Sequence, residues 1–167
     1  MEENSSLFKS FYQTPLGWME IRCTETAITY LCFTDKEDHV EENPAHPLIQ
    51  TAIQQLKEYF NGSLTDFDFP VQPEGTVFQE KVWGLLQDIE FGKTLSYLQL
   101  SRQFGDEKAI RAVGSANGRN PIAIVIPCHR VIGSDGSLVG YAGKLWRKKW
   151  LLDHEHAIIS KQLQMQF

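Results

Sequence analysis

The first third of the chain alternates short runs of aromatic and β-branched residues with gaps the size of a turn. Three such runs, at residues 8–13, 18–23 and 27–33, are separated by gaps at 15–17 and 24–26. Runs and gaps of these lengths are typical of β-hairpins. The pattern therefore predicts an antiparallel meander of three strands.

A loop and a helix are predicted after the meander. Residues 35–44 are charged and end in proline, which indicates a loop. Residues 46–60 then place apolar side chains at helical spacing, and Asn61-Gly62 is a typical helix stop. These side chains are Leu48, Ile49, Ala52, Ile53, Leu56, Tyr59 and Phe60. With a last short strand predicted over 67–71, residues 1–72 are expected to form a small α/β domain, one helix packing on one sheet.

The polar segment 72–75, Gln-Pro-Glu-Gly, is predicted to separate two domains. Beyond it the apolar period becomes helical. Thr76 can cap a helix whose apolar stripe extends to Ile89, and the turn at 91–93 ends it. The second domain is therefore expected to span residues 76–167 and to be mostly helical.

Two shorter helices are predicted next, with a glycine between them. Ser96 opens the first, which closes at Gly105, and residues 108–118 form the second, which is rich in small residues. A helix, a glycine turn and a helix with small residues and arginines are typical of a helix-turn-helix. The predicted fold is thus α+β with two domains, the second one resembling a winged helix.

A final helix is predicted over residues 145–154. Its apolar contacts come from Leu145, Trp146, Trp150, Leu151 and Leu152. The basic residues Arg147, Lys148 and Lys149 are expected to form its solvated face.

Bulk composition favours a globular protein of the cytoplasm. The chain is 42% hydrophobic and 22% charged, and no stretch approaches the roughly 20 apolar residues that cross a membrane. Its acidic, polar N-terminus is the opposite of a secretory signal. Three cysteines, Cys23, Cys32 and Cys128, are too few for a disulfide framework and fit a reducing compartment.

Charge is divided unevenly along the chain. Residues 1–75 hold 4 Lys and Arg against 13 Asp and Glu, a net −9, whereas residues 76–167 hold 12 against 8, a net +4. The two sum to the net −5 of the whole chain. The second half could therefore face a polyanion, although many basic faces bind nothing.

The candidate chemistry lies in residues 121–130, where a continuous apolar run enters a Pro-Cys-His-Arg turn. A run such as 122–126 is typical of a segment buried on both sides. A lone cysteine after such a run is usually a small buried hydrophobe. Here Cys128 is followed by His129 and Arg130, whose positive character would lower the pKa of a thiol.

The segment Pro127-Cys128-His129-Arg130-Val131, with Asn120-Pro121 before it and residues 140–143 (Gly-Tyr-Ala-Gly) after it, resembles the O6-alkylguanine-DNA alkyltransferases. The likeness extends from about Thr76 to Glu155, and the N-terminal half matches only weakly, through a turn at 14–17. The resemblance implies repair of O6-alkylguanine, and of O4-alkylthymine, in double-stranded DNA by irreversible, single-turnover transfer of the alkyl group to Cys128.

The resemblance also implies roles for the neighbours of the thiol. His129 would act as the base, Glu155 would hold its imidazole in one tautomer, and Asn120 would brace the active-site turn. The leaving guanine would receive a hydrogen bond from Tyr97 and backbone N–H groups at 141–143. The pocket is expected to be lined by Val131, Tyr141, Ala142 and Gly143.

DNA would be approached from the minor groove and the target base flipped out. In the family one arginine enters the base stack, and Arg111 matches it. The further DNA-binding residues that the resemblance implies are Tyr97, Thr94, Ser96, Ala112, Gly114, Arg119 and Ser134. A monomer without a cofactor is expected.

Two departures and three alternatives belong beside this prediction. Lys144 stands where the family commonly has a second glycine. Cys23 and Cys32 have no suitably placed His pair, so no metal is predicted, although some relatives bind zinc in this domain. The alternatives are a non-catalytic alkylated-base-binding protein, a Cys-His-Glu hydrolase, and a helix-turn-helix regulator with a sensing cysteine.

Overall fold

An antiparallel meander of three strands forms the N-terminal sheet, as the sequence predicts. In this computed structural model, which describes residues 8–35 and 46–166, the strands are β1 (Phe8–Thr14), β2 (Gly17–Cys23) and β3 (Ile28–Phe33), in the order β1-β2-β3. A two-residue turn joins β1 to β2. In it the Thr14 hydroxyl accepts from Leu16 N–H at 3.0 Å and donates to the carbonyl of Gly17 at 2.7 Å. Apart from Asp35, the loop predicted over 35–44 lies outside the described residues.

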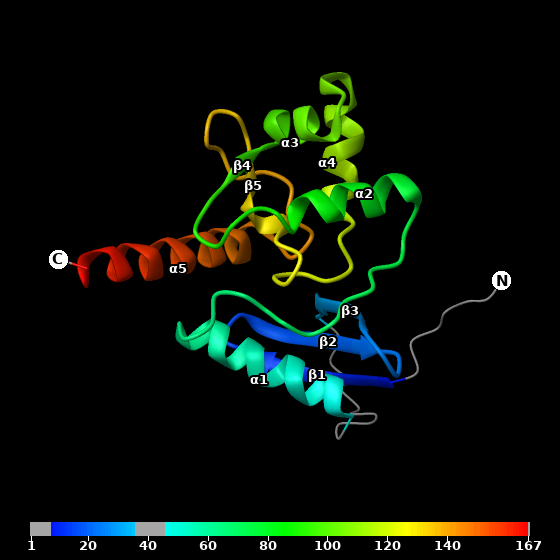
Figure 1. Cartoon of the computed structure of the whole chain (residues 1–167), viewed down its shortest axis with the longest axis vertical. Helices are drawn as coiled ribbons and strands as arrows, with labels where there is room; N and C mark the ends of the chain where they lie inside the picture. The colour runs from blue at the N-terminus through cyan, green and yellow to red at the C-terminus, as the bar shows by residue number, and fades with distance from the viewer. Residues whose placement is uncertain (1–7, 36–45, 167) are drawn as a thin grey trace. The chain divides into compact units, whose positions relative to one another are not determined.

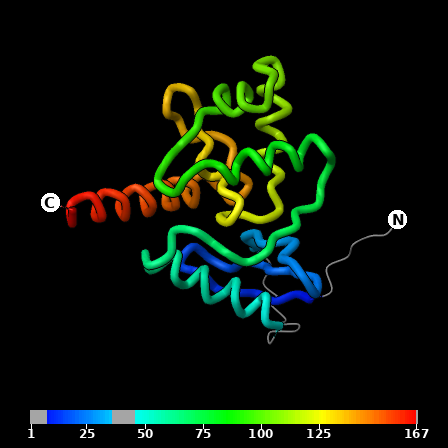
Figure 2. Tube along the Cα trace, viewed as in Figure 1, coloured from blue at the N-terminus to red at the C-terminus, as the bar shows by residue number. Residues whose placement is uncertain are grey.

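Helix α1 (Pro47–Asn61) covers one face of this sheet (Figures 1 and 2). His46 caps its first turn by accepting from Leu48 N–H at 3.2 Å, and Gly62 ends it with a φ of 89°. Its buried side chains follow the predicted helical spacing and are Ile49, Ala52, Leu56 and Tyr59. The apolar face of the helix therefore closes the core of this domain against the sheet.

The strand predicted over 67–71 is wrong. Val71 makes only a single parallel bridge with Ile28, flanked by hydrogen bonds from Ile28 N–H to Pro70 O at 2.9 Å and from Gln72 N–H to Ile28 O at 2.8 Å. Proline at position 70 has no N–H to donate, so a longer ladder cannot form there.

The chain divides into two compact units, Met1–Glu74 and Gly75–Phe167. In the second unit, α2 (Val77–Leu86) and α3 (Tyr97–Phe104) begin with reciprocal capping boxes, Thr76 with Gln79 and Ser96 with Gln99. Helix α2 ends three residues before the predicted Ile89, because the N–H groups of Asp88 and Ile89 bond to carbonyls three residues earlier, which is a turn rather than α-helix.

The helix-turn-helix is completed by α4 (Ile110–Gly118), which packs on α2 and α3. The first two residues of the predicted helix 108–118 belong instead to the 3₁₀ turn η1 (Glu107–Ala109), which is capped by Asp106. Trp83 of α2 donates its Nε1–H to Ala116 O at 2.8 Å and fixes the last turn of α4. A short parallel pair, β4 (Leu95–Ser96) with β5 (Val131–Ile132), lies beside these helices in Figure 1.

Helix α5 (Leu145–Gln164) is ten residues longer than predicted. The added residues, 155–164, are mostly good helix formers such as Ala, Leu, Lys and Gln, so nothing stops the helix at His154. The solvated face predicted for it is wrong at two positions, because Lys148 is fully buried and Arg147 is 7% exposed. Within the described chain, no helix is long and apolar enough to cross a bilayer.

Lys144, the departure noted in the sequence, begins α5 with φ 76° and ψ 143°. Residues other than glycine rarely adopt this backbone region, and holding one there lowers the stability of the fold by about 1–3 kcal/mol. Glycine adopts this backbone region freely but loses about 0.5–1 kcal/mol of chain entropy on folding.

We expect Lys144→Gly to raise the free energy of unfolding by about 1 kcal/mol relative to Lys144→Ala, which keeps the strain. Urea unfolding of both variants measures this, and equal stabilities would contradict it.

Candidate active site

The reactive cysteine stands on a turn that one asparagine closes. Asn120 donates from Nδ2 to Ile126 O at 2.7 Å and to Ile122 O at 3.3 Å, and its Oδ1 accepts from Ile122 N–H at 3.0 Å. Ile126 N–H also donates to Ile122 O at 3.0 Å, and Ile124 has a φ of 71°. The run 122–126 is buried as predicted, except for the half-buried Val125, and its backbone forms this turn. Asn120 thus occupies the bracing position that the resemblance implies.

Cys128 begins the 3₁₀ turn η2 (Cys128–Arg130) and is 6% exposed. Its N–H donates to Ile126 O at 2.8 Å. The cysteine is a free thiol. The Asn120 turn therefore fixes the backbone that carries the thiol just beneath the protein surface.

His129 and Glu155 form a buried pair. Nε2 of His129 lies 2.8 Å from Oε2 of Glu155, and the side chains are 0% and 1% exposed. Because a carboxylate only accepts, this contact places the proton on Nε2. His129 Nδ1 has no hydrogen-bond partner in the described part of the chain. That nitrogen is left as an acceptor, which is the form a general base requires.

Arg130 forms an ion pair with the same carboxylate. Its Nε and Nη2 donate to Glu155 at 2.8 and 3.1 Å, and its Nη1 donates to Ile89 O at 2.6 Å. Glu155 therefore balances the charge of Arg130. Gly92 N–H adds a longer contact to Glu155, at 3.4 Å.

Burial and charge set the protonation of the pair. Burial lowers the pKa of His129, and Arg130 and Lys148 act in the same direction, against the attraction of Glu155. Burial raises the pKa of Glu155, but His129 and Arg130 outweigh it and hold that pKa well below its usual range. The pair is thus a neutral imidazole beside a carboxylate, ready to take up one proton at Nδ1.

Lys148 is the residue that sequence reasoning missed. Its ammonium donates to Val131 O at 2.5 Å and to Val139 O at 2.9 Å, and burial lowers its pKa to about 8. It therefore ties the strand after the cysteine turn to the loop before α5. A sequence signal existed, because Lys148 falls on one helical stripe with Leu151 and Glu155.

Tyr97 lies at the start of α3 and faces the same loop. Its hydroxyl donates to Val139 O at 3.0 Å and to Gly140 O at 3.3 Å. Burial raises its pKa, as does the charge of Cys128, whereas a hydrogen bond with Asn117 lowers it. The hydroxyl implied to face the base is thus paired with loop carbonyls here.

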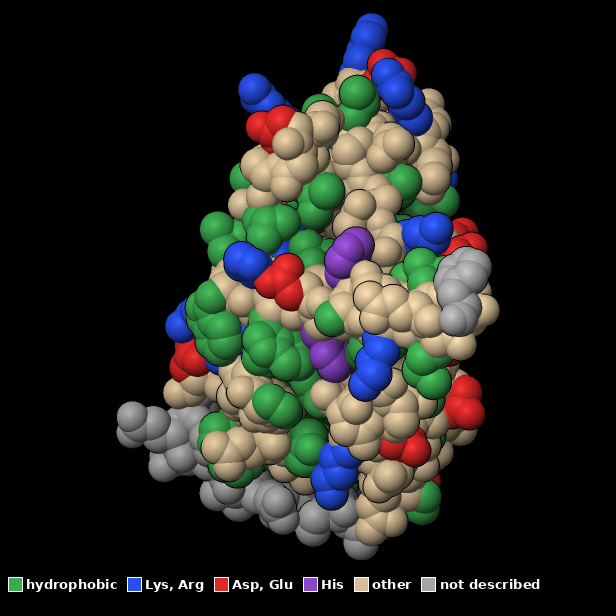
Figure 3. Space-filling model, turned by 90° about the vertical axis from the view of Figure 1, so that its left-hand side faces the viewer, with side chains coloured by type: hydrophobic (Ala, Val, Ile, Leu, Met, Phe, Trp, Pro, Cys, Tyr) green, Lys and Arg blue, Asp and Glu red, His purple; other side chains and the backbone are tan. Residues whose placement is uncertain are grey.

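The residues implied in DNA binding lie mostly on the outside of the second unit. Arg111, Ala112 and Arg119 are exposed on or next to α4, and Thr94 and Ser134 are exposed on loops. Ser96 and Gly114 are half-buried. Figure 3 shows basic side chains projecting from the upper end of the face it displays, the end where α3 and α4 lie in Figure 1.

The implied pocket residues differ in exposure. Val131 is fully buried, Tyr141 and Gly143 are half-buried, and Ala142 is exposed. All of them belong to β5 or to the loop between β5 and α5, which Lys148 and Tyr97 hold through Val139.

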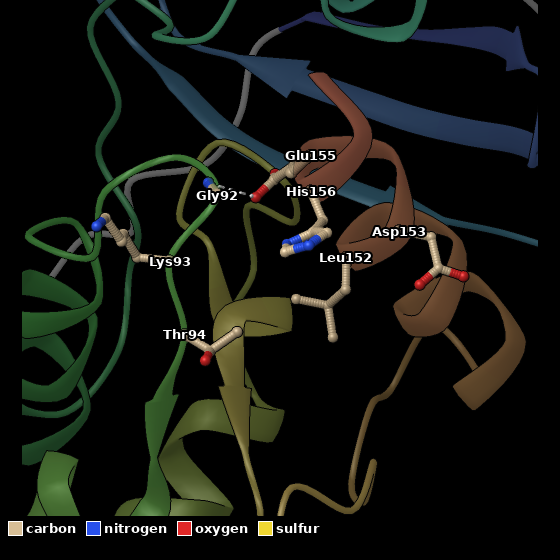
Figure 4. Close-up of a pocket in the computed structure, with 7 residues that line it drawn as sticks. All are labelled: Gly92, Lys93, Thr94, Leu152, Asp153, Glu155 and His156. Atoms are coloured by element: carbon tan, nitrogen blue, oxygen red, sulfur yellow. Dashed lines mark hydrogen bonds between the residues drawn. The ribbon is translucent and has the colours of Figure 1, made fainter. Parts of the chain in front are cut away.

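A separate cavity of about 270 Å³ opens behind Glu155 (Figure 4). Its lining comes from Gly92, Lys93, Thr94, Leu152, Asp153, Glu155 and His156. Cys128 does not line it, so this cavity shares only Glu155 with the site around the thiol. Across the residues described, no cluster of three or more His, Cys, Asp or Glu side chains is placed to hold a metal ion.

The buried pair predicts a loss of stability on acidification. The pKa of His129 in the folded chain lies below its ordinary 6.5, so the unfolded state gains a proton first as pH falls through 6.5. Stability should then decrease by up to about 1.4 kcal/mol per pH unit. Glu155, with a folded pKa below 4.5, adds a further loss only below that pH.

Urea unfolding between about pH 7.5 and about pH 5 measures this slope. His129→Gln, which cannot titrate, should show a shallower slope over the same range. Identical slopes for the two proteins would show that His129 is not held neutral.

Both halves of the chain match family models. Residues 7–73 match the ribonuclease-like domain of 6-O-methylguanine DNA methyltransferase, and residues 77–157 match its DNA-binding domain. The N-terminal match extends the likeness to the half of the chain where the sequence motifs were weak.

Relatives that match over most of their own length point to the same family. The chain is 40% identical to the methylated-DNA–protein-cysteine methyltransferase of Methanosarcina acetivorans over 89% of its length and 98% of that protein, and 44% identical to the constitutive one of Bacillus subtilis over 86% and 92%. A crystal structure of Mycobacterium tuberculosis OGT in complex with DNA superposes with a TM-score of 0.84 at 39% identity, covering 91% of this chain and 94% of that one. From its two domains and these matches, the chain belongs to the O6-methylguanine DNA methyltransferases, the methylated-DNA–protein-cysteine methyltransferase family.

Proposed function

We propose that this chain repairs O6-alkylguanine in duplex DNA by moving the alkyl group onto Sγ of Cys128. The observation that supports it most is the buried pair beside that cysteine, in which Glu155 holds His129 with Nδ1 free to accept a proton. The cysteine turn follows directly from α4, the second helix of the helix-turn-helix. A nucleophile and a DNA-binding element are thus built on adjacent segments.

Transfer needs a thiolate, because the target is a saturated carbon. His129 Nδ1 accepts the thiol proton, directly or through water, while the Glu155 carboxylate balances the charge of the imidazolium that forms. Sγ then attacks the alkyl carbon, an S–C bond forms, and the bond from that carbon to guanine O6 breaks. Tyr97 and the N–H groups at 141–143 donate to the departing guanine, for which Tyr97 must exchange its loop partners for the base.

The base reaches Cys128 by leaving the helix, since its O6 is inaccessible inside a duplex. Arg111 fills the vacated stack, and Ala112 and Gly114 allow α4 to approach the backbone closely. Thr94, Ser96, Arg119 and Ser134 contact phosphates. The two exposed arginines on and beside α4 fit this role.

The reaction occurs once per molecule. A thioether has no carbonyl for water to attack, and a thiolate leaves saturated carbon poorly, so no step regenerates Cys128. O4-alkylthymine presents the same alkyl carbon on an exocyclic oxygen and is a second substrate. The protein works as a monomer, with no cofactor, in the reducing cytoplasm that keeps its cysteines free.

Titration with excess O6-methylguanine DNA tests the chemistry. Intact mass should show one methyl group on Cys128, and transfer should reach a plateau near one methyl per chain. DNA carrying O4-methylthymine should give the same adduct. Transfer far beyond one methyl, or repeated turnover of an activated ester, would instead favour a Cys-His-Glu hydrolase.

Cys128→Ala should abolish transfer and leave binding of lesion-containing DNA within about twofold, because recognition is distributed over α4 and the pocket. Transfer and affinity are measured on the same duplex. Residual transfer by this variant would show that another group is the acceptor.

Arg111→Ala should slow repair of duplex DNA at least about tenfold, since filling the vacancy helps to offset an unstacking cost of a few kcal/mol. Reaction with the free base O6-benzylguanine needs no extrusion and should change less than about twofold. Arg102→Ala, at an arginine of α3 already paired with Glu107 at 2.6 Å, is the matched control. Equal losses on both substrates would assign Arg111 another role.

A further inference from the structure

The loop between β5 and α5 carries the backbone N–H groups that the proposed reaction uses, but its own backbone contributes little to its position. Residues 139–143, all of them described, form no helix or strand. One backbone hydrogen bond, from Lys144 N–H to Tyr141 O at 3.0 Å, closes a turn at the end of the loop. Within the described chain, the N–H groups of Ala142 and Gly143 have no hydrogen-bond acceptor. Side chains from other elements must therefore fix where these donors lie.

Two cationic side chains at the start of α5 hold the loop at its two ends. Lys148 Nζ donates to Val139 O at 2.9 Å. Arg147 Nη1 donates to Gly143 O at 3.3 Å, and its guanidinium carbon lies 4.8 Å from the centre of the Trp146 ring. Both ends of the loop are thus attached to one rigid helix.

The burial of these cations lowers the stability of the fold. Lys148 is fully buried, and Arg147 is 7% exposed. Within the described chain, the Lys148 ammonium forms no ion pair and donates to two carbonyls, while burial lowers its pKa to about 8. A buried charge without an opposite charge beside it is unfavourable, and an apolar side chain of similar length would avoid that loss. The contacts that Lys148 makes with the backbone therefore explain its presence better than stability does.

Tyr97 and Lys148 share one acceptor. The Tyr97 hydroxyl donates to Val139 O at 3.0 Å and to Gly140 O at 3.3 Å, beside the 2.9 Å bond from Lys148 to Val139 O. In the proposed reaction this hydroxyl leaves both carbonyls to donate to the guanine. Lys148 is then the side chain of the described residues that still holds Val139 O.

We propose that Lys148 and Arg147 are positioning residues for alkyl transfer, which keep residues 139–143 in place while the Tyr97 hydroxyl moves from the loop to the departing guanine. This inference depends on the function proposed above. A loop that stays fixed keeps its open N–H groups directed at guanine O6 as negative charge develops on that oxygen. The two cations act through the loop and do not touch the alkyl group.

Lys148→Met, which keeps the length of the side chain and removes the ammonium, tests this directly. Methyl transfer from duplex O6-methylguanine DNA and reaction with free O6-benzylguanine should both slow at least about tenfold, because the loop serves the leaving guanine of either substrate. Lys149→Met is the matched control, since the exposed Lys149 ammonium pairs with Asp153 at 2.6 Å. It should change both rates less than about twofold.

Trypsin cleavage of the native protein separates positioning from a general loss of stability. Lys144 ends the loop and Lys108 lies in η1, and both are exposed. In Lys148→Met, cleavage after Lys144 should become about fivefold faster, because the loop opens more readily once a hydrogen bond is lost. Cleavage after Lys108 should keep its rate, as mass spectrometry of the fragments would show.

Arg147→Met provides a second, independent variant and decides the question if Lys148→Met does not fold. It should slow both reactions about threefold and raise cleavage after Lys144 without raising cleavage after Lys108. Unchanged transfer rates, or cleavage that rises equally at both lysines, would overturn the inference. If the unaltered chain transferred no methyl group to Cys128, the proposed function would fail instead. The cleavage rates do not depend on transfer, so the two failures are distinguishable.

Discussion

One buried carboxylate holds the reactive end of this molecule together. Glu155 reaches from α5 to His129 and Arg130 on the turn that carries the thiol, and to the backbone of Gly92. A buried charge of this kind is tolerated only when its partners surround it, and removal of one partner from such a pair typically costs about 3–5 kcal/mol. The geometry that the chemistry needs and the packing of α5 are therefore enforced by the same contacts.

This arrangement also explains the order of the elements. The recognition helix α4 ends at Gly118, Asn120 closes the next turn, and Cys128 follows, with Trp83 anchoring the last turn of α4 from behind. Few freely rotating bonds lie between the surface that would meet DNA and the sulfur that would react. Lys148 completes the frame by joining β5 to the loop before α5. A reaction that depends on near-attack geometry gains from such short, rigid connections.

Much of the fold could be predicted because local signals were strong. The meander, α1 and the capped starts of α2 and α3 follow from hairpin spacing, helical period and capping residues. Helix ends were less accurate, since α5 simply continues through residues without a stop signal. The prediction was wrong for two side chains. Arg147 and Lys148 are charged and were therefore assigned to solvent, but in the fold both are buried and donate hydrogen bonds to backbone carbonyls. The turn at 122–126 depends on hydrogen bonds from Asn120, which hydrophobicity alone cannot reveal.

The near-complete burial of Cys128, at 6% exposure, has a consequence for a protein that is spent by its own reaction. Any stray electrophile or oxidant that reached the sulfur would consume a whole molecule without repairing anything, because a thioether or a higher oxide of sulfur is not restored. Because the modified sulfur is not restored, the protein must select its substrate before the sulfur reacts. Because the thiol lies beneath the surface, the fit of a molecule into the recess decides whether it can react, and selectivity is set at the step of access.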